Sequence, residues 1–138
     1  MNPDHEAAIR ASWADVASRA EVVAAAFHAR LIERDPEARA HFAGVEPAAH
    51  QRRLTQVLQE MAVSLDEPER LVEVLVPLGR RHASYGVREE QFAEAGDALV
   101  EALRETLGVA FTAEVEEAWR ELVDLVAAVM RRAIHARL

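Results

Sequence analysis

Apolar residues recur three and four positions apart along almost the whole chain, which is the spacing of one face of an α-helix. No stretch sustains the alternation of apolar and polar positions that a half-buried strand requires. The chain also contains only 5 glycines and 5 prolines among its 138 residues, so there are few helix breakers. The pattern therefore predicts an all-α protein.

Residues that start or stop a helix predict the boundaries in the first half of the chain. Asn2 is suited to cap a first helix that has Pro3 in its first turn. Asp35, Pro36 and Glu37 combine a cap, a first-turn proline and an acid that complements the helix dipole. We expect helices over residues 3–20, 23–34, 36–42 and 47–65, with a loop over 43–45.

In the second half of the chain we expect two long helices and shorter pieces. Asp66 and Pro68 start one or two further turns. Pro77 is expected in the first turn of a separate short helix, because a proline inside a helix costs about 3 kcal/mol. Gly86 ends that helix and Gly108 ends the next one. The expected helices run over residues 77–85, 92–107 and, after a cap at 112, 113–133.

Composition favours one folded domain and removes several kinds of chemistry. Hydrophobic residues make up 51% of the chain and charged residues 29%, which is enough for a core in a chain of this length. We expect a single domain over residues 1–138. All 16 basic residues are arginine, so the chain has no lysine for a P-loop or a Schiff base. Without cysteine there is no disulfide, thiolate or iron–sulfur chemistry.

The charge balance argues against anionic surfaces as main partners. The chain carries 24 acidic residues against 16 basic ones, a net charge of −8, which nucleic acids and membranes repel. No apolar run has the length of a membrane span, and the N-terminus lacks the pattern of a signal peptide. We expect a soluble, cytoplasmic protein with neither a nucleic acid nor a membrane as its partner.

Three of the six histidines are candidates for chemistry, because they fall on apolar faces. His50 precedes Leu54 by one helical turn and His82 follows Leu78 by one turn, so both imidazoles are expected to point inward. His28 is the third. For one inward histidine a backbone carbonyl is the commoner partner. Three at once favour a metal or ligand site, since a neutral imidazole is a common metal ligand.

Several segments of the chain resemble the globin family, in the right order and over nearly the whole length. The resemblance rests on Ile9-Arg10-Ala11-Ser12-Trp13, Phe27-His28-Ala29-Arg30-Leu31, Asp35-Pro36-Glu37 with Phe42, residues 78–87 around His82, and residues 107–112 followed by Ala118-Trp119. The segment around His82 is similar to the proximal-histidine segment of neuroglobin-like and flavohaemoglobin-type globins. The resemblance implies a bacterial single-domain haemoglobin, with a three-on-three helical sandwich of roughly 7–8 helices around a haem pocket.

The resemblance also assigns roles to individual residues, with haem b as the cofactor. It places His82 as the proximal iron ligand. It places His50 on the distal side, where the imidazole would donate to a gas ligand or bind the iron as a sixth ligand. The other haem contacts it implies are Phe42, Arg53, Leu54, Arg81, Val87 and Leu99, and the other gas-ligand contacts are Phe27, His28 and Leu54. The two arginines would pair with the haem propionates, or else lie as solvated surface charges.

Four positions depart from the flavohaemoglobin-type pattern. His28 and His50 stand where those globins usually carry a tyrosine and a glutamine. The role of His28 is open: a second hydrogen bond to the ligand, recruitment of water, competition for the iron, or a bond to the backbone or to His50. Phe92 and Ile134 replace the tyrosine and glutamate that form hydrogen bonds near the proximal histidine. Their apolar character disfavours peroxidase-like or fast dioxygenase chemistry, because an electron-rich proximal ligand favours O–O cleavage.

The leading hypothesis is a globin that reversibly binds dioxygen or another diatomic gas such as CO or NO, as an oxygen carrier or gas sensor, and as a monomer or homodimer. Three alternatives stay open. The first is a bis-histidine redox or sensor globin with His50 on the iron. The second is a nitric oxide dioxygenase or weak peroxidase that works with an external reductase. The third is a globin-shaped interaction module without a cofactor, against which the inward His82, Phe42 and Val87 argue.

Overall fold

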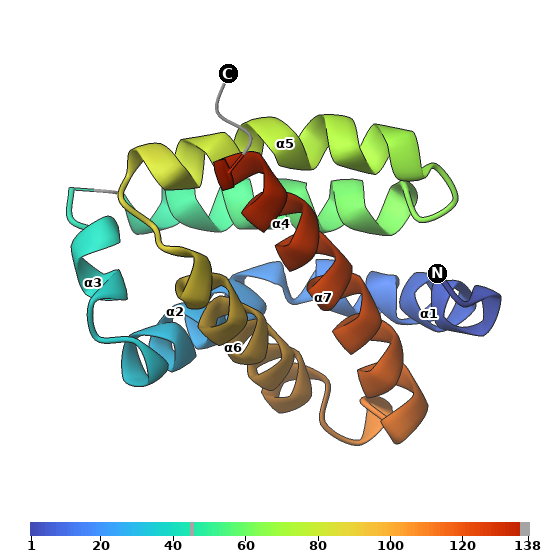
Figure 1. Ribbon diagram of the computed structural model, residues 1–138. Helices are drawn as coiled ribbons and strands as arrows, with labels where there is room; N and C mark the ends of the chain where they lie inside the picture. The colour runs from blue at the N-terminus through green and yellow to red at the C-terminus, as the bar shows by residue number, and fades with distance from the viewer. Residues whose placement is uncertain (45, 136–138) are drawn as a thin grey trace.

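The computed structural model describes residues 1–44 and 46–135, and within them the chain forms seven α-helices, one 3-10 turn and no strand (Figure 1). The elements are α1 (Pro3–Ser18), α2 (Ala20–Arg34), α3 (Ala38–His41), α4 (Pro47–Val63), α5 (Pro68–Ser84), α6 (Glu89–Leu107), η1 (Gly108–Ala110) and α7 (Ala113–His135). The prediction of an all-α protein is confirmed. The predicted loop over 43–45 lies partly outside the described residues.

The residues predicted to start and stop helices do so at several boundaries. The side-chain oxygen of Asn2 accepts a hydrogen bond from the backbone N–H of Asp4 at 2.8 Å, which caps α1. The hydroxyl of Thr112 accepts one from the backbone N–H of Val115 at 3.3 Å, at the start of α7. Gly108 ends α6 with a φ of +56°, a conformation that favours glycine.

The predicted break before Pro77 is wrong, because α5 is continuous through this proline. Pro77 and Glu73 are both exposed, so water can solvate the Glu73 carbonyl that lacks an amide donor. Packing on α7 favours the unbroken helix. Gly79 is buried so closely against α7 that a Cβ atom built there would lie 2.9 Å from the carbonyl oxygen of Met130. Tertiary packing therefore overrides the local preference of the proline.

The helices pack in two layers of three. One layer contains α1, α4 and α5, and the other contains α2, α6 and α7 (Figure 1). The most extensive contacts join α2 to α6 and α5 to α7, while α1 also packs on α7. This is the predicted three-on-three arrangement.

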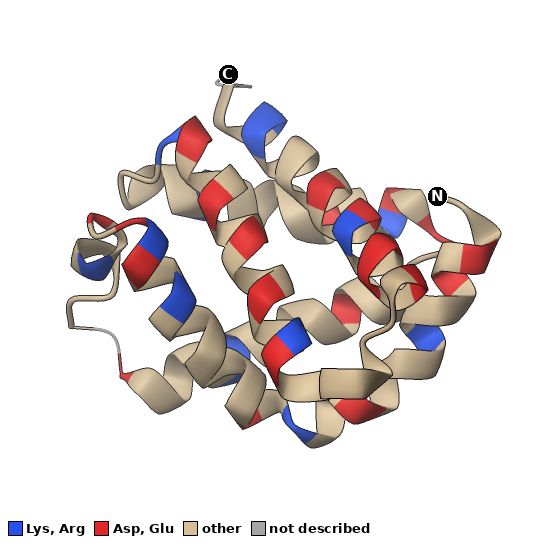
Figure 2. Cartoon of the chain, turned by 90° about the horizontal axis from the view of Figure 1, so that it is seen from below, with Lys and Arg blue, Asp and Glu red and all other residues tan. Residues whose placement is uncertain are grey.

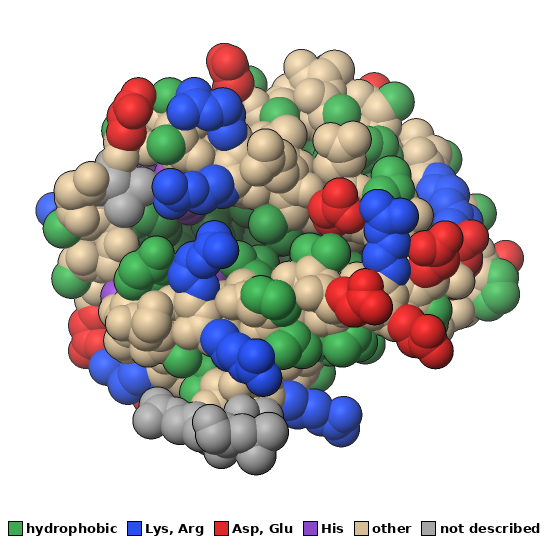
Figure 3. All heavy atoms as spheres, turned by 90° about the horizontal axis from the view of Figure 1, so that it is seen from above, with side chains coloured by type: hydrophobic (Ala, Val, Ile, Leu, Met, Phe, Trp, Pro, Cys, Tyr) green, Lys and Arg blue, Asp and Glu red, His purple; other side chains and the backbone are tan. Residues whose placement is uncertain are grey.

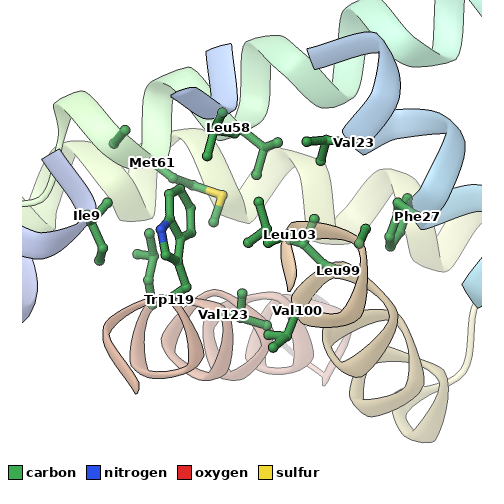
Figure 4. Close-up of a cluster of buried hydrophobic side chains, with 14 of the residues drawn as sticks. Ile9, Val23, Phe27, Leu58, Met61, Leu99, Val100, Leu103, Trp119 and Val123 are labelled. Carbon is green, nitrogen blue, oxygen red and sulfur yellow. The ribbon is translucent and has the colours of Figure 1, made fainter. Parts of the chain in front are cut away.

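The hydrophobic core lies between the two layers (Figure 4). Ile9 of α1, Leu103 of α6 and Trp119 of α7 are fully buried and converge there. Toward one side the core continues through Phe27 and Leu58, which also line a cavity. The apolar faces of the helices therefore build the core and the cavity together.

Trp119 brings a polar group into this core, and Ser12 satisfies it. The indole N–H donates to the Ser12 hydroxyl at 2.9 Å. The hydroxyl in turn donates to the carbonyl oxygen of Ala8 at 2.8 Å, which fixes its orientation. A buried donor that loses its acceptor costs about 1–3 kcal/mol.

We therefore expect Ser12→Ala to lower the free energy of unfolding by about 1–3 kcal/mol, because the indole N–H of Trp119 would stay buried without an acceptor. Ser18→Ala is the matched control, since Ser18 also donates to a carbonyl of α1, that of Asp15 at 2.9 Å, but is exposed. Urea denaturation of both variants measures the difference. Equal losses would contradict a stabilising role for the Trp119–Ser12 hydrogen bond.

Candidate functional site

A cavity of about 290 Å³ lies between α2, α3, α4, α5, α6 and α7 and is lined mostly by apolar side chains. The predicted haem contacts that line it are Phe42, Arg53, Leu54, Arg81, His82, Val87 and Leu99. Phe27 and His50, predicted to contact a gas ligand, line it as well. The structure therefore brings these residues together at one site, and their individual roles stay predictions.

His82 is one of three half-buried histidines that line this cavity, with His41 and His50, and it lies near the C-terminal end of α5. Its Nδ1 lies 2.8 Å from the carbonyl oxygen of Leu78, one turn earlier. With Nδ1–H donating to that carbonyl, Nε2 carries the lone pair, and it has no hydrogen-bond partner in residues 1–44 and 46–135. The ring of Phe92, centred 5.9 Å away, packs beside the imidazole. A ring oriented through one nitrogen and open at the other is the usual arrangement of a metal-binding histidine.

Burial lowers the pKa of His50 and of His82, two of the three histidines that line the cavity, from the ordinary value of 6.5. For His82, desolvation is the largest cause of the lowered pKa, and the hydrogen bond to Leu78 opposes it. For His50, desolvation also dominates the lowered pKa, followed by repulsion from a charged His28. Both imidazoles are therefore neutral at neutral pH, which is the form that binds iron.

We expect the stability of the cofactor-free protein to fall as the pH drops below 6.5, the ordinary pKa of histidine. In the unfolded chain His50 and His82 take up protons near that pH, whereas in the folded chain they do so only at a lower pH. The unfolded state then binds more protons, so acid favours unfolding until the lowered pKa values are passed. Urea denaturation from about pH 8 to about pH 5 measures this trend. An equally steep trend in a His50→Gln/His82→Gln variant would contradict it.

His50 lies in the first turn of α4, among aromatic rings. Its ring centre is 4.7 Å from that of Phe42, nearly perpendicular at 80°, and 6.5 Å from that of Phe27, nearly parallel at 16°. Within the described part of the chain its side chain forms no hydrogen bond. A neutral imidazole with an unused N–H in an apolar cavity is suited to donate to a small ligand.

His28 differs from its expected position, because it is exposed and does not line the cavity. Its ring packs edge-on against Phe42 at 4.7 Å and lies 6.3 Å from His50. Phe27 takes the inward position instead, with 9% of its surface exposed. Adjacent helical residues point about 100° apart, so both cannot face the core fully. The expected inward orientation of His28 is wrong, and its contact with a gas ligand stays a prediction.

Arg53 and Arg81 place positive charge at the mouth of the cavity. Both line it and both are exposed. Neither forms an ion pair with an acid in the part of the chain that the structure describes. A haem brings an apolar ring, an iron that needs a neutral imidazole, and two propionates that need cations. The apolar walls, His82 and the two arginines fit each of these requirements.

Gln91 and two methionines were not predicted as part of the cavity lining. Gln91 is buried; its side-chain nitrogen donates to Asp35 at 2.8 Å, and its oxygen accepts from the backbone N–H of Arg88 at 2.7 Å. These bonds tie the start of α6 to the end of α2. Met61 and Met130 continue the apolar faces of α4 and α7 into the cavity. The helical period is a signal for the methionines, whereas Gln91 and Asp35 are 56 residues apart and share no local pattern.

Comparison with known proteins agrees with this site. A family model of the globins matches residues 25–130. The chain belongs to the globin family. This globin is 30% identical to a neuroglobin of Dissostichus mawsoni, over 88% of this chain and 85% of the relative. It is 29% identical to a flavohemoprotein of Bordetella pertussis, over 91% of this chain but 33% of that protein, so it spans about a third of the flavohemoprotein's length.

Solved structures show the same fold. An engineered carbene transferase from Rhodothermus marinus superposes with a TM-score of 0.88 at 25% identity, covering 98% of this chain and 94% of the other. A hexacoordinated heme protein from an anhydrobiotic tardigrade gives a TM-score of 0.85 at 18% identity, covering 98% and 96%. A flavohemoglobin from Malassezia yamatoensis gives 0.82 at 20% identity, covering 98% of this chain and 37% of its own. The predicted family and the predicted globin fold are both confirmed.

Proposed function

We propose that this globin binds haem b and, through it, reversibly binds dioxygen or another diatomic gas. The observation that carries the proposal is the state of His82: kept neutral by burial, oriented through Nδ1 by the Leu78 carbonyl, and open at Nε2 in an apolar cavity. Membership of the globin family supports it.

Different lining residues would contact different parts of the haem. His82 would bind the iron through Nε2, while its bond to Leu78 fixes the plane of the ring. Phe42 and Val87 would pack on the porphyrin, and Arg53 would pair with a propionate. When bound, the haem supplies a ferrous iron with one position open to a gas.

The distal residues would determine how the gas is held. His50 would donate its N–H to the partial negative charge that develops on dioxygen, and a charge-assisted hydrogen bond of this kind stabilises the ligand. Phe27 and Leu54 line the cavity with apolar surface, which excludes water and so strengthens that bond. The chain's own residues therefore favour dioxygen over a less polar gas.

Visible spectra of the haem-loaded, reduced protein under nitrogen, oxygen and carbon monoxide test the proposal. We expect a Soret band, a distinct spectrum for each gas, and return of the first spectrum when the gas is removed. Absence of a Soret band after haem addition would refute haem binding. Immediate, irreversible oxidation under oxygen would refute reversible oxygen binding.

A second candidate is a bis-histidine globin, in which His50 binds the iron until a gas displaces it. This candidate is favoured because the neutral His50 ring forms no hydrogen bond within the described residues, so one of its nitrogens could bind the iron. Under nitrogen, two sharp visible bands would identify this state, whereas one broad band would identify an open iron.

The enzymatic alternative, nitric oxide dioxygenation or weak peroxidation with an external reductase, has less support from the site. The ring beside His82 is that of Phe92, which has no polar group to strengthen the proximal ligand. The cytoplasmic location and the monomeric or homodimeric state stay predictions from the sequence. Within the described residues, no helix is both long and apolar enough to span a membrane.

A further inference from the structure

Seven arginines lie in or beside the segments that line the cavity. Arg53 and Arg81 line the cavity, four others are next to lining residues in the sequence, and Arg132 follows one of these four. We call these residues the arginine face: Arg39, Arg52, Arg53, Arg80, Arg81, Arg131 and Arg132. Figure 3 shows arginine side chains gathered around a hollow with hydrophobic walls.

The arginine face differs from the rest of the surface because its charges are not compensated. Within the described chain none of its members forms an ion pair. Seven of the eight arginines described outside it do, the exception being Arg19, which donates to the Thr106 carbonyl; the seven are Arg10, Arg30, Arg34, Arg70, Arg88, Arg104 and Arg120. The segments 47–59, 74–87 and 125–135 contain six of the seven members and no acidic residue. Seen from the opposite side, acidic residues run along α6 and α7 (Figure 2). The described residues thus form a positive face in a chain with a net charge of −8.

A haem does not account for this positive charge. Its two propionates would be neutralised by the two arginines that line the cavity, Arg53 and Arg81. The remaining members of the arginine face would still lack a counter-charge. Uncompensated charge of one sign around a cavity mouth attracts and orients a partner that carries the opposite charge.

We propose that the arginine face is the docking surface for an acidic electron-transfer protein. The inference rests on the proposed function, because the face surrounds the opening through which the edge of the haem would be reached. An acidic partner would be attracted by this face and repelled by the acidic surface of α6 and α7, so charge alone would orient it. In the docked pair the partner's reduced cofactor would supply one electron, and a bound ferric haem would take it up.

Titration of the ¹⁵N-labelled globin with an acidic flavodoxin at low ionic strength tests the proposal. We expect NMR shift changes on the arginine face, and binding weakened about 10-fold or more by Arg52→Glu/Arg80→Glu. These two arginines lie outside the cavity lining, so haem uptake is retained. Arg10→Glu/Arg70→Glu changes the net charge equally at two exposed sites outside the arginine face and is expected to alter binding less than about 2-fold.

A second measurement follows reduction of the ferric, haem-loaded protein by the reduced flavodoxin. We expect the rate to fall as salt is added, and to be lower in Arg52→Glu/Arg80→Glu than in the control variant. NMR shift changes outside the arginine face would overturn the proposal. So would an equal loss of flavodoxin binding in Arg52→Glu/Arg80→Glu and Arg10→Glu/Arg70→Glu. So would binding of anionic vesicles or duplex DNA, but not flavodoxin, to the arginine face. The NMR titration can be done without haem. It therefore tests docking separately from the spectra that test haem binding.

Discussion

Replacing His82 with alanine is expected to abolish stable haem uptake. His82 is the cavity imidazole whose orientation is fixed by the Leu78 carbonyl and whose Nε2 is open. Losing a residue that only orients a metal ligand typically costs 10- to 100-fold in affinity, so losing the ligand itself is expected to cost about 100-fold or more. Titration with haem, followed at the Soret band, measures the affinity.

Two controls separate ligand loss from unfolding in this variant. His50→Ala removes another imidazole that lines the cavity and is expected to retain haem. Imidazole added to His82→Ala is expected to restore part of the Soret band, because it replaces the missing ring in a cavity that is still folded. Wild-type haem affinity in His82→Ala, with no added imidazole, would show that another group holds the iron.

Replacing His50 with alanine is expected to speed dioxygen dissociation from the loaded protein by roughly 10- to 100-fold. The lost bond is a charge-assisted hydrogen bond, which is worth about 1.5–3 kcal/mol. Carbon monoxide develops less charge when bound, so its dissociation is expected to change much less. Stopped-flow and flash-photolysis kinetics measure both rates. If His50 binds the iron at rest, the same variant would instead speed the entry of both gases.

His28→Ala provides the comparison for the distal side. We expect it to retain haem and to change ligand dissociation, but less than His50→Ala, because His28 is exposed and acts on the cavity through its neighbours Phe42 and His50. Unchanged dissociation in both variants would show that the distal side of the pocket has been misassigned.

The parts of the site that were predictable from the sequence are those fixed by short-range helical spacing or by the resemblance to globins. His82 and Leu78 are one turn apart on α5, so their hydrogen bond follows from the helix itself. His50 and Leu54 share a face of α4 for the same reason. The family resemblance added the roles that spacing alone left open.

The parts that were not predictable depend on tertiary packing. Pro77 has a strong local preference, yet Gly79 packs on α7 two residues later and the helix stays whole. Phe27 shares the helical spacing of Val23 and Leu31, so its inward position was predictable, whereas the exposure of its neighbour His28 was not expected. The uncompensated charge of the arginine face likewise emerges only when helix ends far apart in the chain meet around one opening.

A crystal structure of the haem-loaded, reduced protein tests the central claim most directly. We predict that the iron is bound by Nε2 of His82, that Nδ1 still donates to the Leu78 carbonyl, and that His50 lies on the opposite side of the porphyrin. A structure in which His82 points away from the iron, or in which the haem lies outside this cavity, would contradict the account.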